Sequence, residues 1–247
     1  MEVVENMKIT RVILLLFVFS FIQACSSTNK TVSYEWNQSK DPLEGLNRSI
    51  YSFNTTADRL VLRPIAKGYD AVLPKPAKTG VSNFFSNLGE PISAVNNLLQ
   101  GKVDRALGNT YRFVVNSTIG VLGLFDVAKH QGVNKTPEDL GQTLAVWGVK
   151  PGPYLMLPFL GPTNLRDGIG RSVSSAVYYP INEISDNGGT RLGLTALDLV
   201  DSRAKLLGID SALEKQLDPY IFIKTTVENG RTDSINDGKV IEEEFDF

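Results

Sequence analysis

The stretch DPLEGLNRSIYSFNTTADRLVLRP, residues 41–64, sets the fold that we expect for this 247-residue chain. Asp41, Pro42 and Glu44 have the spacing of a helix start: a capping residue, a first-turn proline and an acidic residue three positions after the cap. The apolar residues then recur at intervals of three and four, which places them on one helical face. That face consists of Leu43, Leu46, Ile50, Phe53, Ala57, Leu60 and Val61. Pro64 is expected to end the helix.

Later stretches repeat this helical pattern. In TPEDLGQTLAVWG, residues 136–148, Thr136 has the place of a helix cap and Gly148 that of a helix end. A further apolar stripe, ended by Gly208, consists of Leu192, Ala196, Leu199, Val200, Leu206 and Leu207. Asp210 is expected to begin another helix that continues to Ile221. Alternating strand patterns with hairpin turns are scarce. The sequence therefore predicts a mainly α-helical protein.

Three uncharged segments interrupt this pattern, at residues 113–125, 151–165 and 172–182. Each is too short, or too broken by glycine and proline, to cross a bilayer as a helix. Two interpretations remain open. The segments are buried parts of a helical core, or they are short amphipathic helices and bent loops within one membrane leaflet. Irregular backbone at membrane depth is tolerated only where it packs on protein or lines a wet cavity.

The N-terminal stretch MKITRVILLLFVFSFIQA, residues 7–24, has the pattern of a secretory signal peptide. Lys8 and Arg11 form a basic segment, and the apolar run that follows is too short to span a bilayer comfortably. The preceding residues are acidic, which suits a signal peptide poorly, so Met7 is an alternative start to Met1.

Cys25 is the only cysteine of the chain. Export favours cysteines that pair as disulfides, so a lone cysteine calls for another role. Cys25 follows IQA and precedes SSTN, an arrangement that resembles a bacterial lipobox with Cys25 as the lipidated first residue. The alternative is a stray cysteine behind an ordinary cleavage site or an uncleaved anchor. Ser26 stands where an aspartate would resemble an inner-membrane retention signal, so we expect the outer membrane, facing the periplasm.

These patterns divide the chain into four parts. They are a signal peptide (1–24), a lipidated, flexible tether (25–40), a helical domain (41–227) and an acidic, disordered tail (228–247). The net charge of −2 and the lack of a basic stripe argue against nucleic acid as a partner.

A search for catalytic chemistry finds little. His130 is the only histidine, which leaves no His/Cys metal site, and no nucleophile-elbow or phosphate-loop pattern occurs. Asp126, Glu138, Asp139 and Asp167 have positions typical of helix caps and loops. We therefore expect no enzyme, no metal and no cofactor. Two alternatives stay open: an enzyme that uses carboxylates alone, and a hydrolase at the membrane surface, which needs an accessible nucleophile and base.

Read in order, six motifs resemble the MlaA/VacJ family of outer-membrane lipoproteins. They are DPLEGLNRSIYSFN (41–54), RPIAKGYDAVLP (63–74), VSNFFSNLGEPISAVNNLLQG (81–101), RFVVNSTIGVLGLFDVA (112–128), DLGQTLAVWGVKPGPYLMLPFLGPTNLRDGIG (139–170) and DPYIFIK (218–224). Leu140 and Ala145 depart from the residues that we expect in this family.

The resemblance implies a lipid transporter rather than an enzyme. Members are expected to form a flat ring of amphipathic helices embedded in the periplasmic leaflet of the outer membrane, beside trimeric porins. A channel through the ring would admit phospholipids that have strayed into the outer leaflet. It would pass them to a soluble periplasmic carrier, which maintains the lipid asymmetry of the membrane. The alternative is a porin-associated structural lipoprotein without lipid transport.

A lipid passage needs polar groups inside the ring, because a headgroup crosses hydrocarbon only at high cost. Two polar stretches are candidates for it, and their residues are Asn116, Ser117, Thr118, Thr163, Asn164 and Arg166. Glycines that could let loops bend and gate the passage are Gly120, Gly123, Gly152 and Gly161. For Arg166 and Asp167 we favour a structural ion pair. For Asn47 and Asn54 we favour hydrogen bonds to neighbouring helices.

The lipobox pattern yields the first testable prediction. Protein purified from outer membranes should begin at Cys25 and carry acyl chains on that residue. Intact-mass spectrometry with lipid extraction measures both properties. A mature protein with a free thiol, or one that retains residues 1–24, would contradict the prediction.

Overall fold

The computed structural model describes residues 41–178 and 180–239. Cys25, the predicted signal peptide and the predicted tether lie outside these residues. The described part is mainly helical, as predicted, and is made of α2 (Glu44–Ala57), η2 (Asp58–Leu62), α3 (Arg63–Val72), α4 (Lys75–Leu88), α5 (Glu90–Leu99), α6 (Val103–Thr118), α7 (Val127–His130), α8 (Leu140–Val146), β1 (Tyr154–Leu157), β2 (Gly161–Asn164), α9 (Leu165–Val177), α10 (Pro180–Ile184), α11 (Gly188–Lys205), η3 (Leu207–Ile209), α12 (Asp210–Leu213) and α13 (Pro219–Ile235).

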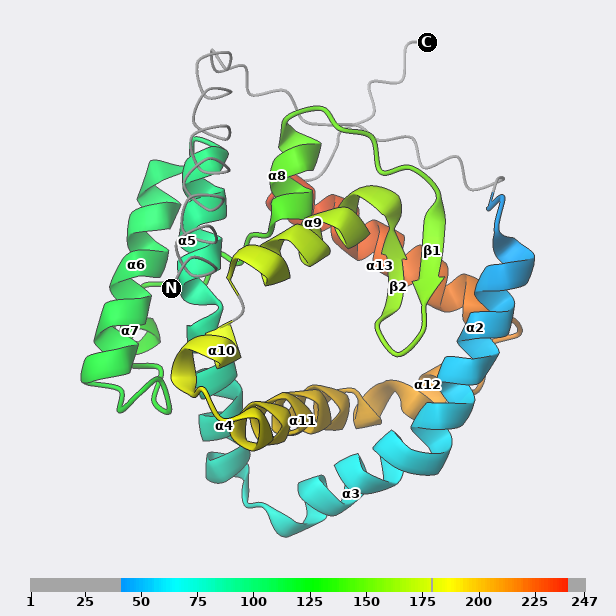
Figure 1. Ribbon diagram of the computed structural model, residues 1–247, viewed down its shortest axis with the longest axis horizontal. Helices are drawn as coiled ribbons and strands as arrows, with labels where there is room; N and C mark the ends of the chain where they lie inside the picture. The colour runs from blue at the N-terminus through cyan, green and yellow to red at the C-terminus, as the bar shows by residue number, and fades with distance from the viewer. Residues whose placement is uncertain (1–40, 179, 240–247) are drawn as a thin grey trace, which may run out of the picture. The chain divides into compact units, whose positions relative to one another are not determined.

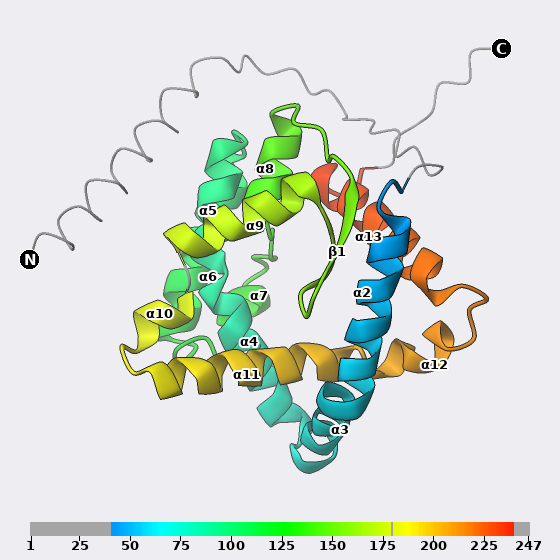
Figure 2. The same ribbon diagram turned by 45° about the vertical axis from the view of Figure 1, so that its right-hand side comes forward.

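Contacts between these elements close a ring (Figure 1, Figure 2). α2 continues through η2 into α3, and α11 packs on both α3 and α4. From α4 the contacts run through α5 and α8 to α9, and from there to β2 and β1. β1 returns to α2 and completes the circuit. The ring-like arrangement of helices agrees with the prediction.

The first helix does not end at Pro64. α3 begins at Arg63 and has the proline in its first turn, directly after the π-helical turn η2. A proline lacks an N–H and clashes with the carbonyl four residues earlier, so a local widening of the helix helps to accommodate it. Asp41 is not a standard cap either, because Leu43 holds the cap position and Asp41 Oδ1 accepts from Asn47 Nδ2 at 3.0 Å.

Two further helix ends differ from the prediction. Asp139 caps α8, with its carboxylate accepting from the Gln142 amide at 2.9 Å, whereas the predicted cap Thr136 donates its hydroxyl to Asn109. The helix that begins at Asp210 ends at Leu213 rather than continuing to Ile221, and α13 starts anew behind Asp218. The predicted end at Gly148 is confirmed, since its φ of 89° lies in the left-handed region.

The predicted disordered tail from residue 228 is wrong for residues 228–239. α13 runs to Ile235, and Glu228, Ile235 and Asn236 are buried. Composition suggests a solvated tail because the stretch is acidic. However, Arg231 in this stretch forms ion pairs with carboxylates at two other helices. Residues 240–247 lie outside the described part.

A β-hairpin stands where the sequence predicts only bent loops. β1 and β2 pair antiparallel, with Tyr154 opposite Asn164 and Leu157 opposite Gly161. Two side-chain amides of α2, here called the amide clamp, extend the sheet beyond β1. Asn47 donates to the Tyr154 carbonyl at 3.1 Å and accepts from the Met156 amide at 2.9 Å.

The second amide of the clamp, Asn54, lies two helical turns further along α2. It donates to the Leu157 carbonyl and accepts from the Phe159 amide, both at 2.9 Å. Asn47 and Asn54 therefore satisfy the edge of the hairpin as a third strand would. The prediction that these two asparagines bond to neighbouring helices is wrong in the partner, because both bond to the backbone of the β-hairpin.

Most of the buried residues in the described part of the chain are polar. The largest fully buried side chains include Arg112 together with Asn47, Asn96, Asn97 and Asn109, whereas many of the buried apolar residues are alanines. Large apolar side chains lie instead at the surface: Leu60 is 72% exposed and Leu122 68% exposed. This distribution is the reverse of that in most water-soluble domains.

The uncharged segments differ from one another. In residues 113–125 the exposed side chains include Val114, Ile119, Leu122 and Phe125, so burial in a core is the wrong interpretation for most apolar residues of that segment. In residues 151–165 Tyr154 and Met156 are buried and pack with Tyr220, as the core interpretation expects. Among the described residues no helix is both long and apolar enough to cross a membrane.

The amide clamp yields the second prediction. Asn47→Ala leaves the Tyr154 carbonyl and the Met156 amide buried without their partner, so we expect a loss of about 3 kcal/mol in the free energy of unfolding. Urea unfolding in detergent, followed by circular dichroism, measures it. The control Asn54→Ala removes equivalent but more exposed bonds and should cost about 1 kcal/mol. Equal losses in both variants would contradict this account.

Candidate functional site

A pocket of about 280 Å³ lies beside the β-hairpin and is the candidate site. We call it the hairpin pocket. It has both polar and apolar walls, drawn from the hairpin, α9, α13 and the turn before α8. The lining residues that matter here are Tyr154, Thr163, Asn164, Arg171, Glu228 and Arg231. Such mixed walls suit a ligand with a polar head.

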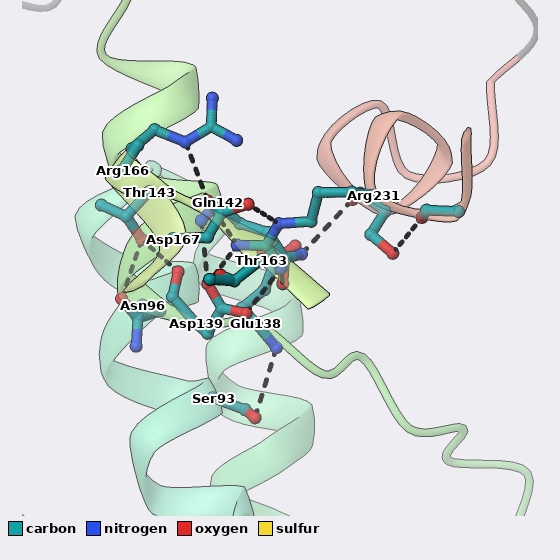
Figure 3. A network of polar contacts seen from close by, with 12 residues as sticks. Ser93, Asn96, Glu138, Asp139, Gln142, Thr143, Thr163, Arg166, Asp167 and Arg231 are labelled. Atoms are coloured by element: carbon teal, nitrogen blue, oxygen red, sulfur yellow. Dashed lines mark hydrogen bonds and ion pairs between the residues drawn. The ribbon is translucent and has the colours of Figure 1, made fainter. Parts of the chain in front are cut away.

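Arg231 lines the pocket and lies in a network of polar contacts, which Figure 3 shows. Its guanidinium binds both carboxylate oxygens of Asp139 at 2.6 Å and both oxygens of Asp167 at 2.8 and 3.0 Å. It also donates to the side-chain carbonyl of Gln142 at 3.2 Å. These bidentate bonds connect α13 to the first turns of α8 and α9. Gly141 permits the approach, because a Cβ there would lie 2.4 Å from Asp167 Oδ1.

Asp167 stays ionised within this network. Burial alone would raise its pKa, but the hydrogen bonds from Arg166 and Arg231 outweigh burial and hold the pKa below its usual value. Arg166 Nε lies 2.9 Å from Asp167 Oδ1, and both side chains are buried. The favoured interpretation of Arg166 and Asp167 as a structural ion pair is confirmed.

The structure does not bring the six predicted passage residues together. Thr163 and Asn164 line the hairpin pocket, and Asn164 also caps α9. Arg166 is buried against Asp167 and is not among the pocket's lining residues.

The other three passage residues lie at the C-terminal end of α6. Asn116 is buried, donates to Asp126 and accepts from the Ala128 amide. Ser117 accepts from Asn87, and Thr118 donates to the Val114 carbonyl. These three residues stabilise local structure, and none of them lines the hairpin pocket.

The predicted gating glycines lie in two loops. Gly120 and Gly123 belong to residues 119–125, here called the apolar loop. In this loop Val121 and Leu122 have positive φ angles of 52° and 57°, which are unfavourable for residues that carry a Cβ. Gly152 precedes β1 and Gly161 is the first residue of β2, directly after the hairpin turn, at φ angles of 69° and 79°. Whether either loop gates a passage stays a prediction.

A second cavity, of about 1190 Å³, lies beside α4 and the apolar loop. Its walls include Lys75, Lys129 and Lys135 as well as Leu124 and Phe125. Arg112, at its base, is fixed by Glu90 at 2.7 Å and by Asp126 at 3.0 Å. Burial raises the pKa of Glu90 more than the bond from Arg112 lowers it. This cluster joins α5, α6 and the turn before α7 and is structural.

The carboxylates noted in the sequence have structural roles. Asp126 caps α7 and Asp139 caps α8, and Glu138 is buried with Lys102 Nζ at 2.9 Å from its carboxylate. His130 lies at the end of α7 with its Nδ1 against the Asp126 carbonyl at 2.8 Å. Within residues 41–178 and 180–239, no three His, Cys, Asp or Glu side chains group as a metal site would require.

The sequence analysis did not single out Arg171, and three further lining residues of the hairpin pocket lie in stretches that it misread: Tyr154, Glu228 and Arg231. Tyr154 lies in a stretch that reads as a loop. The other two lie in a stretch whose composition suggests a solvated tail. A helical signal was present, because Asp218 and Pro219 have the spacing of a cap and a first-turn proline.

Comparison with known proteins agrees with this architecture. The model of the MlaA lipoprotein family matches residues 39–233, so the chain belongs to that family. The resemblance stated from the motifs is thereby confirmed.

Named relatives are similar over most of their length. The intermembrane phospholipid transport system lipoprotein MlaA of Escherichia coli (strain K12) is 37% identical over 188 residues, 74% of each chain. The protein of the same name in Haemophilus influenzae is 32% identical over 224 residues, 90% of this chain and 88% of that one. An uncharacterized protein of Rickettsia typhi is 36% identical over 196 residues, 79% and 78% of the two chains.

A solved structure is similar in fold as well. It comes from a study of the structural basis for maintenance of bacterial outer membrane lipid asymmetry. Its TM-score is 0.71 at 34% identity, and the match covers 79% of this chain and 99% of that one.

The Arg231 network yields the third prediction. Arg231→Met leaves two carboxylates without their shared cation, so we expect a loss of about 3–5 kcal/mol in the free energy of unfolding. Arg171→Met is the matched control, because Arg171 lines the same pocket without a described ion pair, and it should change stability by less than about 0.5 kcal/mol. Urea unfolding in detergent measures both. Similar losses in the two variants would refute the structural role of Arg231.

Proposed function

We propose that this chain is an outer-membrane lipoprotein that removes misplaced phospholipids from the outer leaflet. In this proposal the ring lies in the periplasmic leaflet, anchored through Cys25 and held beside a trimeric porin. Phospholipid passes through the ring to a soluble periplasmic carrier. The relatives from Escherichia coli and Haemophilus influenzae are named for intermembrane phospholipid transport, and membership of their family supports the proposal.

The reversed distribution of side chains carries the proposal. Exposed apolar side chains are unfavourable in water by about 25 cal/mol per Å², but contact with acyl chains removes this cost. They occur in α2, η2 and α3, in the apolar loop, at the hairpin tip, where Phe159 is 75% exposed, and on several other helices. A surface of this kind fits a ring that lies among lipid tails.

The polar interior fits the same location. Without water around them, helices gain little from apolar contact and associate through small and polar residues instead. The described helices pack in this way: Asn97 and Asn109 both donate to the Thr136 carbonyl, and Thr143 donates to Asn96. A phospholipid headgroup that enters the ring would need further polar groups, and the lining of the hairpin pocket supplies such groups.

The principal alternative is a lipoprotein that positions porins without moving lipid. Both accounts place the apolar surface among lipid tails. They differ at the hairpin pocket, which should contact phospholipid only if lipid enters the ring. The hydrolase alternative finds no support in the carboxylates noted in the sequence, because within the described residues Asp126 and Asp139 are helix caps and Glu138 and Asp167 are in ion pairs.

Site-specific photo-crosslinking distinguishes the two accounts and is the fourth prediction. A photoreactive residue is placed at Leu122 in the apolar loop, at Ser175 in the hairpin pocket, or at Ser202 on α11 as an exposed control outside that pocket. Full-length protein is irradiated in outer membranes that contain labelled phospholipid. We expect labelled adducts at Leu122 and Ser175, and Ser175 should exceed Ser202.

The outcomes separate clearly. Adducts at Leu122 with none at Ser175 would favour the porin scaffold over the lipid conduit. Adducts at neither position would contradict both accounts, because both place the apolar loop in the membrane. Co-purification of porin is measured in the same preparations.

A further inference from the structure

The hairpin pocket contains an anionic group that the structure leaves without a partner. Glu228 of α13 lines the pocket and is only 8% exposed. Within the described part of the chain, neither a hydrogen bond nor an ion pair within 4.0 Å reaches its carboxylate. Lys224, one turn earlier, offsets the charge only in part, and burial raises the pKa of Glu228 above its usual value. A buried carboxylate in this state favours a cationic ligand.

A second unpartnered group lies in the same wall. Tyr154 is 4% exposed, and its hydroxyl is buried without a hydrogen-bond partner. Tyr154 and Glu228 lie close enough for the carboxylate to raise the pKa of the phenol further, after burial itself. A buried hydroxyl without a partner costs about 1–3 kcal/mol, so a ligand that bonds to it is favoured.

A cationic side chain lies in the same pocket as these two groups. Arg171 of α9 lines the pocket, is exposed, and makes no ion pair with the residues that the structure describes. Ser174 and Ser175, one turn further along α9, add two hydroxyl groups to the same wall. Guanidinium and hydroxyl groups together are the usual donors for a phosphate.

The remaining charges of the pocket are satisfied within the protein. Arg231 neutralises Asp139 and shares Asp167 with Arg166. Among the lining residues, the charges left for a ligand are therefore one anion, which is buried, and one cation, which is exposed. Lys224 is buried nearby, with its Nζ 5.6 Å from the centroid of the Tyr154 ring, but it does not line the pocket. This arrangement suits a zwitterion whose ammonium enters first and whose phosphate stays nearer the solvent-exposed side.

We propose that the hairpin pocket binds a phosphoethanolamine headgroup, with the ammonium at Glu228 and Tyr154 and the phosphate at Arg171. The order of groups matches that of the lipid, in which the phosphate lies between the acyl chains and the terminal ammonium. The inference rests on the proposed function, which it deepens by naming the headgroup. A glycerol headgroup shares the phosphate but has no cation for Glu228.

Competition between two lipids tests this inference and is the fifth prediction. Lipid-free, full-length protein in detergent is mixed with equal amounts of dioleoyl phosphatidylethanolamine and dioleoyl phosphatidylglycerol, and native mass spectrometry counts each bound lipid. We expect the ethanolamine lipid to be favoured about tenfold, as one charge-assisted bond warrants. Glu228→Gln should bring the ratio to about one, and Tyr154→Phe should lower it by about threefold.

Two controls identify the groups. Arg171→Gln should weaken both lipids by a similar factor and leave their ratio unchanged, because both carry the phosphate. Asp104→Asn removes an exposed carboxylate outside the pocket and should alter neither the ratio nor the total. Thermal unfolding shows whether the Glu228→Gln variant is folded. If that variant is unfolded, Tyr154→Phe tests the inference instead, because it removes a single oxygen that has no hydrogen bond.

The outcomes distinguish the headgroup assignment from the proposed lipid-transport function on which it rests. Equal binding of the two lipids by the unaltered protein, or a ratio that neither pocket variant changes, overturns the headgroup assignment and leaves lipid transport in place. Binding of neither lipid overturns both. Soluble phosphorylethanolamine is the last probe: displacement of the lipid at equal concentration would indicate a soluble ligand and also overturn the assignment.

Discussion

The guanidinium group of Arg231 is the interaction on which the site depends. It lies on α13 and binds Asp139, the cap of α8, and Asp167, in the first turn of α9, so three helices meet at one cation. The contact requires Gly141, because a side chain there would occupy the space of the Asp167 carboxylate and the guanidinium. The hairpin lies between α8 and α9 in the sequence. Because Arg231 fixes the first turns of both helices, it also fixes the hairpin wall of the pocket.

Burying such a network costs desolvation that an apolar core would avoid, so the network is informative about the surroundings of the ring. A domain in water gains most from turning its large apolar side chains inward. The described helices leave many of theirs exposed and pack through polar side chains, and the cluster of Arg112, Glu90 and Asp126 is a second example. Both features are favourable where acyl chains surround the ring. Polar contacts then hold the helices together, and exposed apolar side chains carry no cost in free energy.

The sequence predicts helices well where the pattern is local, as in α2 and α11, but it does not reveal which face is buried. Periodicity places Leu46 and Phe53 on one face, and the usual assumption of aqueous surroundings would bury that face, whereas both residues are exposed and Asn47 is buried. The hairpin was missed because β1 is stabilised by Asn47 and Asn54, more than a hundred residues away. Arg231 was missed because its partners lie 64 and 92 residues earlier, so composition alone marks its segment as solvated. Cys25 stays a prediction, as it lies outside the described residues.

Tyr154 connects the two parts of the structure that hold the hairpin. Its carbonyl accepts from Asn47 on α2, while its ring lies at the edge of the Tyr220 ring, with centroids 6.1 Å apart, and lines the pocket. The Tyr220 ring in turn contacts Tyr51 of α2 and the Arg48 guanidinium. α2 therefore positions the phenol although none of its residues is among those that line the pocket. A change in the register of α2 against β1 would shift the Tyr154 hydroxyl away from Glu228, so residues on the outer, apolar helix can influence headgroup binding without touching the ligand.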